Sequence, residues 1–249
     1  FNENRHCWDK AAVSDHDAST LAFICKLSRI FGGQISDTLM TSVAKRFLLE
    51  EQEFPYFMIT QRVKSPNTKL PFYDDLYSAI TNKTKIQLTY RTGGPEKTVK
   101  AWPISFIMCD GMWYLGYLLE PSRGKAREIR TLRYGHIVNV ADTGESFAKP
   151  AWVKSALKDA RNIWFNSKRD TKAVLEIDNC IKDYFLLSDY FPRQKITTQG
   201  KRTFRIETVL AHELEAIPTI MRFMPFIKVV SPTALRESVR SKAKAYLAA

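Results

Sequence analysis

The sequence predicts an α+β protein with a helical segment, a small five-stranded β-barrel and a second β-sheet domain in succession. Two patterns support this fold class. Between residues 84 and 140 the apolar period is two, and five short strands within about 55 residues are typical of a small antiparallel barrel. Over residues 171–249 the predicted order is strand, helix, strand, strand, helix, strand, which is the split βαβ order of ferredoxin-like domains.

Residues 1–70 are predicted to form a helical linker and dimerisation segment. Apolar residues recur at helical spacing over 21–30 and again over 39–48, and Gly32-Gly33 separates the two runs. We therefore expect a helical hairpin over 17–53. A helix-turn-helix that reads duplex DNA is the weaker interpretation, because the second helix ends in an acidic run that would face phosphates.

Residues 71–148 are predicted to form the barrel. A short helix over Tyr73–Asn82 precedes the strands, and Asp110-Gly111 is a residue pair typical of a tight β-hairpin turn. The five strands are expected over residues 86–90, 98–109, 112–119, 128–134 and 136–140.

A connector, residues 149–170, is predicted between the barrel and the C-terminal domain, with a helix from Lys149 to Asn166. The ferredoxin-like domain is then expected to occupy residues 171–249. Its last helix follows Pro232, a residue that favours the first position of a helix.

The chain is strongly basic. It contains 38 Lys and Arg residues against 26 Asp and Glu residues, which gives a net charge of +12 and a pI of about 9.5. This charge favours a polyanionic partner such as nucleic acid, a nucleotide or an acidic membrane surface. A basic surface that only keeps the protein soluble is an equal alternative on composition alone.

Cysteine usage and hydropathy indicate a cytoplasmic protein without a membrane span. The four cysteines are scattered without CxxC spacing, which is typical of reduced thiols, and the four histidines do not cluster with them. No metal site and no cofactor is therefore expected. Because the chain begins at Phe1 and not at Met, we expect it to be a fragment whose natural N-terminus lies upstream.

Cations and aromatic residues are interleaved in the predicted barrel. Cations bind phosphates and aromatic rings stack on bases, so this combination is typical of single-stranded nucleic acid binding. On the residues alone, aromatic rings that fill the barrel and cations that face solvent explain the pattern better. The nine cations are Lys85, Arg91, Lys97, Lys100, Arg123, Lys125, Arg127, Arg130 and Arg133.

Two short motifs give the chain a family resemblance. Trp113-Tyr114-Leu115 follows the predicted hairpin turn, and Arg130-Thr131-Leu132-Arg133-Tyr134-Gly135-His136-Ile137 lies downstream. Together they resemble the WYL domain of bacterial transcription regulators, although the second motif has Gly135 and His136 where the family usually has Asp and Arg. Val229-Val230-Ser231-Pro232, with Leu235-Arg236 behind it, is similar to the ending of the C-terminal extension that follows WYL domains.

The resemblance implies a DNA-binding transcription regulator that forms a homodimer and senses a ligand through an Sm-like barrel. It also implies a winged helix-turn-helix upstream of this chain, through which duplex DNA would be bound. An anionic effector, single-stranded nucleic acid or a nucleotide, is implied at Arg130 and Arg133. Strand alternation places those two side chains on opposite faces unless a bulge intervenes, and we expect Arg133 to be the principal contact.

Three further residues complete the candidate ligand-binding set. Trp113 and Leu115 share one strand face and are expected in the core, so Tyr114, on the other face, is the better candidate for a pocket hydroxyl. Ser105 on the preceding strand is a candidate phosphate donor or an ordinary surface serine. His136 is included because it replaces the Arg of the family motif.

We expect no catalytic residues and no enzymatic activity. His212-Glu213-Leu214-Glu215-Ala216 begins like the zinc-protease motif HExxH, but Ala216 stands where the second histidine is needed. The alternative function, from another class, is a single-strand-binding accessory domain of a nucleic-acid processing enzyme. Incubation of a labelled single strand with the protein and magnesium distinguishes the two, because a sensor leaves the strand intact.

Overall fold

The computed structural model describes residues 71–120, 128–166 and 168–248. The predicted helical hairpin of the segment 1–70 lies outside the described residues. Within the described residues the fold is α+β and contains two antiparallel sheets, one with five strands and one with four. No helix in this part of the chain is long and apolar enough to cross a membrane.

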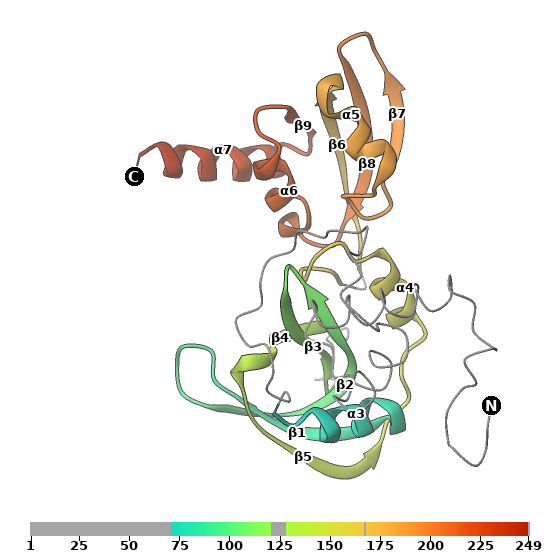
Figure 1. Ribbon diagram of the computed structural model, residues 1–249, viewed down its shortest axis with the longest axis vertical. Helices are drawn as coiled ribbons and strands as arrows, with labels where there is room; N and C mark the ends of the chain where they lie inside the picture. Colours follow the sequence, from blue (N-terminus) through green and yellow to red (C-terminus); the bar gives the residue numbers. More distant parts are fainter. Residues whose placement is uncertain (1–70, 121–127, 167, 249) are drawn as a thin grey trace, which may run out of the picture. The chain divides into compact units, whose positions relative to one another are not determined.

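The first sheet has five strands and is preceded by one helix, in the chain order that the sequence predicted (Figure 1). The Asp110-Gly111 turn joins β2 and β3, and both residues have positive φ, 48° and 74°, as a tight hairpin of this type requires. The elements are α3 (Tyr73–Asn82), β1 (Thr84–Tyr90), β2 (Lys97–Cys109), β3 (Met112–Leu119), β4 (Ile129–Arg133), the 3-10 helix η2 (Tyr134–His136) and β5 (Ile137–Ser146).

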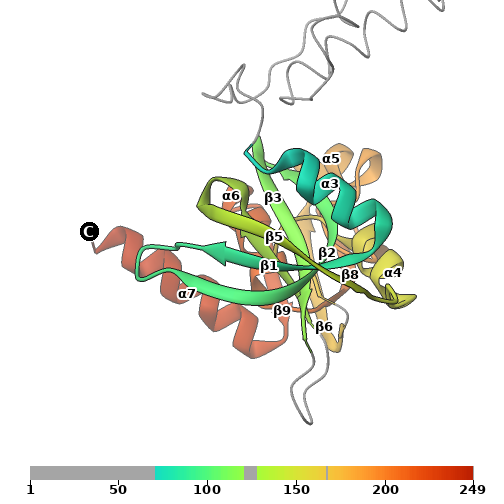
Figure 2. The ribbon, with the colours of Figure 1, turned by 90° about the horizontal axis from the view of Figure 1, so that it is seen from below.

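Where the sequence predicted a small barrel, the five strands form an open, curved sheet that is not closed by strand pairing. Their order is β4-β3-β2-β1-β5, so β4 and β5 are the two edges and do not pair with each other. The three-residue η2 nevertheless joins these two edge strands, so the sheet must bend strongly to bring them together. Figures 1 and 2 both show β1 and β5 running across the direction of β3. The pairing stops short of closure because β4 has only five residues and ends at η2.

Helix α4 (Trp152–Asp159) packs Val153 and Ala156 into the core of the first sheet. This core also contains Trp102, Ile104, Leu118, Ile129, Phe147 and Phe165. The predicted connector helix was too long, since α4 ends at Asp159 instead of continuing to Asn166. Side-chain hydrogen bonds from Asn162 hold the chain that follows in a non-helical conformation.

The second sheet has the strand, helix, strand, strand, helix, strand order that the sequence predicted (Figure 1). Its strand order is β7-β8-β6-β9, and all neighbours are antiparallel. The elements are β6 (Thr171–Asp178), α5 (Lys182–Leu187), β7 (Lys195–Gln199), β8 (Thr203–Leu210), α6 (Ile217–Arg222), β9 (Ile227–Ser231) and α7 (Thr233–Leu247); two 3-10 helices, η3 (Asn179–Ile181) and η4 (Glu213–Glu215), precede α5 and α6.

One face of the second sheet is covered by the helices. Alternate residues of β6 and β8 are fully buried, and they share a core with Phe185 of α5, Ile220 of α6 and Leu235 of α7. Burial of each large apolar side chain contributes about 1.5–3 kcal/mol to stability, so this core is a main source of the domain's stability. Beyond Val239 most of α7 is exposed, and Figures 1 and 2 show its end extending away from the sheet.

Candidate functional site

The ladder between β3 and β4 places Tyr114 directly opposite Arg133. Directly opposed residues of antiparallel strands have their side chains on the same face, so these two candidate residues are neighbours. Arg133 is exposed, whereas Tyr114 is only 9% exposed. Arg133 is therefore the member of the pair that a ligand in solution reaches first.

Arg130 lies on the opposite face of β4 and is directly opposite Tyr117. The register from Ile129 to Arg133 contains no bulge, so strand alternation separates the two arginines as expected. A single flat ligand therefore does not contact both Arg130 and Arg133 from one face of this strand.

Tyr117 is a neighbour of Arg130 that the sequence reasoning missed. Its side chain is buried, and burial raises the pKa of Tyr117 to about 12. The nearby Tyr90 hydroxyl adds to this rise, whereas the positive charge of Arg130 lowers the pKa. Strand alternation could have indicated this residue, because Tyr117 is three residues after Tyr114 and must face the other side of β3.

Ser105 and His136 are not joined to the Tyr114–Arg133 pair by hydrogen bonds within the described residues. The Ser105 hydroxyl donates to the carbonyl oxygen of Phe106 at 2.9 Å, so it is directed at the backbone. His136 ends η2, is half-buried, and its carbonyl oxygen accepts from the N–H of Arg91 at 2.9 Å.

Three of the nine cations are neutralised by neighbouring carboxylates. Lys85 lies 3.0 Å from Glu145 and 3.5 Å from Glu120, and Lys100 also pairs with Glu145. The hydrogen bonds from Lys100 and Lys85 lower the pKa of the Glu145 carboxyl. Arg91 pairs with its neighbour Glu96 in the same way. These cations stabilise the sheet locally and contribute little to a site for an external anion.

Arg130 and Arg133 remain exposed, and neither forms an ion pair with the residues that the structure describes. Lys97 is exposed as well. The other three cations, Arg123, Lys125 and Arg127, lie outside the described residues. The uncompensated charge of β4 is therefore concentrated at the two arginines that the family resemblance singled out.

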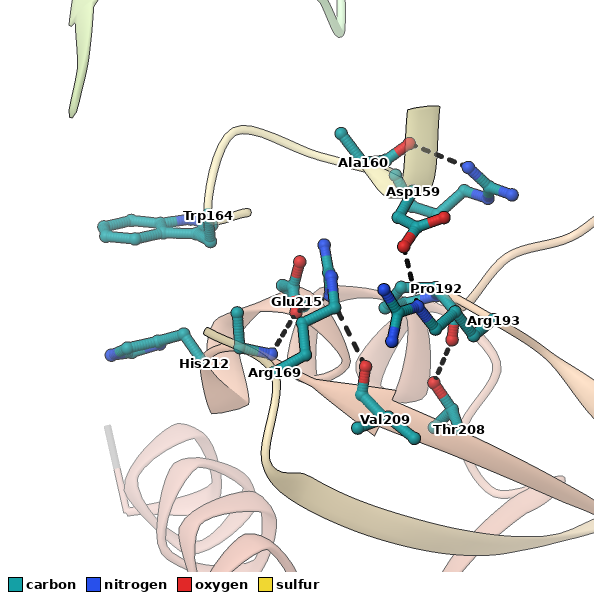
Figure 3. Close-up of polar contacts among 12 residues, drawn as sticks. Asp159, Ala160, Trp164, Arg169, Pro192, Arg193, Thr208, Val209, His212 and Glu215 are labelled. Atoms are coloured by element: carbon teal, nitrogen blue, oxygen red, sulfur yellow. Dashed lines mark hydrogen bonds and ion pairs between the residues drawn. The ribbon is translucent and has the colours of Figure 1, made fainter. Parts of the chain in front are cut away.

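The incomplete zinc-protease motif has a structural role. The Nδ1 atom of His212 accepts the N–H of Leu214 at 3.1 Å and caps η4, while Glu215 is buried in an ion pair with Arg169 (Figure 3). In the described part of the chain, no group of three or more His, Cys, Asp or Glu residues is placed to hold a metal ion.

One family model matches the part of the chain that contains the second sheet. Residues 171–247 match the family model of the WCX domain. This match covers the four-stranded sheet with its helices, from β6 to the end of α7, and we call these residues the WCX segment. No curated protein matches the chain.

Two of the solved structures similar to the chain have low identity. One, described as a CRISPR Cas-related protein, is 14% identical with a TM-score of 0.47, covering 70% of this chain and 50% of that one. The other, proteasome accessory factor B/C (PafBC) of Arthrobacter aurescens, is 14% identical with a TM-score of 0.35, covering 91% of this chain and 34% of that one. The chain thus spans half the length of the first structure and about a third of the second.

Proposed function

We propose that the chain is the ligand-sensing and dimerising portion of a WYL-type transcription regulator. Two independent features support this: the WCX match at residues 171–247, and the two motifs on β3 and β4 that resemble the WYL domain. In this proposal the curved five-stranded sheet is the Sm-like fold of a WYL domain. The WCX segment is ferredoxin-like, and its strand order β7-β8-β6-β9 is the one expected for that fold.

The observation that supports the ligand site is the direct opposition of Tyr114 and Arg133 on neighbouring strands. An exposed guanidinium without a carboxylate partner among the described residues binds a phosphate through two parallel N–H donors. The effector is therefore an anion, either single-stranded nucleic acid or a nucleotide. Tyr114 borders the site and offers a hydroxyl or ring edge, whereas Arg130 on the other face serves a rim or a second contact.

Replacement of Arg133 tests this site. Arg133→Ala should weaken the binding of a short labelled single strand by about 1.5–3 kcal/mol, the range for a lost charge-assisted hydrogen bond. The plot of log K against log salt should also become less steep by about 0.7, because one phosphate contact is lost. Fluorescence anisotropy at several salt concentrations measures both.

Lys201→Ala is the matched control, since Lys201 is an exposed cation on the β7–β8 turn. It should change affinity little. Equal weakening by the two substitutions would mean that only the total charge matters, and the assignment to Arg133 would be wrong. Incubating the labelled strand with protein and magnesium separates the sensor from a nucleic-acid processing module, because a sensor leaves the strand intact.

A further inference from the structure

The segment that follows α4 is fixed to the WCX segment by side-chain contacts. The Nδ2 atom of Asn162 donates to the carbonyl oxygens of Leu214 and Glu215, at 3.1 and 3.2 Å. Asp159 accepts from the Nε atom of Arg193 at 2.7 Å. Figure 3 shows this segment beside the loop between β8 and α6. The backbone next to Asn162 is therefore held in position before any ligand arrives.

Trp164 lies two residues after Asn162, and it is unusually exposed for a tryptophan. Its backbone N–H donates to the Oδ1 atom of Asn162 at 3.0 Å, yet 47% of the residue is open to solvent. The indole stacks on the ring of His212, with centroids 5.8 Å apart and planes 25° from parallel (Figure 3). His212 is exposed as well, so the two rings form an aromatic surface that faces solvent.

The hydrogen bonding of His212 gives this surface a donor. Because Nδ1 accepts the N–H of Leu214 at 3.1 Å, the proton of the neutral ring is on Nε2. Nε2 makes no hydrogen bond to any residue that the structure describes. The surface therefore offers an aromatic face and, at the edge of the second ring, an N–H group for an acceptor.

A buried ion pair fixes the backbone on which His212 stands. The Nη1 atom of Arg169 lies 2.6 Å from the Oε2 atom of Glu215, and the two side chains are 2% and 1% exposed. The same carboxylate oxygen accepts the N–H of Ala211 at 2.7 Å, directly before His212. The residues on both sides of His212 are thus held by hydrogen bonds, which is the preorganisation that a binding surface needs.

We propose that Trp164 and His212 form a stacking subsite for a base of single-stranded nucleic acid. A nucleotide chain offers the π-face of a base to the free face of the indole and further hydrogen-bond acceptors to Nε2 of His212, whereas an aliphatic ligand would use neither. The alternative is that the ring stack only stabilises η4 by packing on it. In that case we would expect a buried indole, whereas Trp164 is exposed. The proposal rests on the ligand class of the proposed function and adds a second contact, on the WCX side of the chain.

Substitution of Trp164 in the whole protein tests the subsite. The probe is a short fluorescein-labelled oligodeoxythymidine, read by anisotropy. Trp164→Ala should weaken binding about 5- to 150-fold, the factor that corresponds to one stacked base. Trp164→Phe, which keeps an aromatic face, should recover most of this loss. Tyr77→Ala removes another aromatic side chain, 56% exposed on α3, and should leave affinity within about twofold.

A probe without phosphate separates this proposal from the anion site. Adenosine should shift the NMR signal of the Trp164 indole N–H in the wild type and in Arg133→Ala alike. One outcome overturns the subsite and leaves the proposed function standing: Arg133→Ala loses oligonucleotide affinity, Trp164→Ala does not, and adenosine causes no shift. The reverse pattern supports the subsite and overturns the anion site on β4. Unchanged circular dichroism of each variant excludes misfolding as the cause.

Discussion

At the scale of single residues, the ion pair Arg169–Glu215 is notable because both side chains are buried. Within the described residues, Arg169 Nε, Arg169 Nη2 and Glu215 Oε1 are buried without hydrogen-bond partners. Replacing either residue by Ala leaves the other charge buried and unpaired, so each variant should lose about 3–5 kcal/mol of the free energy of unfolding. Denaturant unfolding followed by circular dichroism measures this loss.

The double variant Arg169→Met with Glu215→Leu is the control for this prediction. It removes both charges and keeps the volume, so its stability should be close to that of the wild type or higher. A double variant as unstable as either single variant would show that the lost packing matters, and not the unpaired charge.

The raised pKa of Tyr117 predicts a loss of stability at alkaline pH. In the unfolded chain Tyr117 loses its proton near its ordinary pKa of 10.0, whereas the folded protein keeps the proton up to about pH 12. Between these values the unfolded state binds fewer protons, so the free energy of unfolding falls as the pH rises from about 10 towards 12. The free energy of unfolding of Tyr117→Phe, measured with denaturant, should fall less steeply over this pH range than that of the wild type. Parallel curves for the two proteins would contradict the prediction.

At the scale of elements, the β2–β3 hairpin depends on the left-handed backbone of its turn. Gly111 has a φ of 74°, so Gly111→Ala should destabilise the protein by about 1–2 kcal/mol. Gly135→Ala is the matched control, because Gly135 does not have positive φ and an added Cβ would meet nothing within 4 Å. Thermal unfolding of both variants tests the difference, and an equal loss would argue against strain in the turn.

The alternation of apolar residues predicted the elements well, because each pattern depends on a local period. Met112–Leu119 was predicted as a strand with the observed bounds, and the element order of the WCX segment was also correct. The connector helix was overextended because the hydrogen bonds of Asn162 compete with the helical backbone, and they need partners distant in the sequence. The sequence could not show that the predicted barrel stays open, because pairing between the edge strands β4 and β5 is not a local property.

The candidate site was predictable in residue type but not in pairing. The opposition of Tyr114 and Arg133 depends on the β3–β4 register, which no single strand determines. Ser105 was a weak candidate because a serine hydroxyl also bonds to nearby backbone, as its contact with Phe106 shows. The stack of Trp164 on His212 joins residues 48 positions apart in the sequence, so no periodicity could indicate it.

At the scale of the whole molecule, most of the large exposed apolar side chains in the described part of the chain lie in the WCX segment. Leu187 on α5 is 85% exposed, and Tyr246 and Leu247 at the end of α7 are 81% and 83% exposed. Large apolar side chains that are exposed at the end of a helix can be buried against another protein surface when they form a continuous patch with it. A homodimer, which the proposed function includes, would bury such side chains if they lie at its interface.

The net charge should make the proposed homodimerisation and the proposed oligonucleotide binding depend on salt in opposite ways. Two copies of +12 repel each other, so added salt, which screens this repulsion, should strengthen a dimer held by apolar contacts. Binding of a single strand releases counterions and should weaken over the same range.

Light scattering at tens of micromolar protein should give twice the 28.7 kDa of one chain, with a dimer fraction that rises with salt. A mass of 28.7 kDa at every salt concentration would refute the dimer. A dimer that dissociates as salt increases would mean that ion pairs hold it, and Leu187, Tyr246 and Leu247 would then be free for another partner.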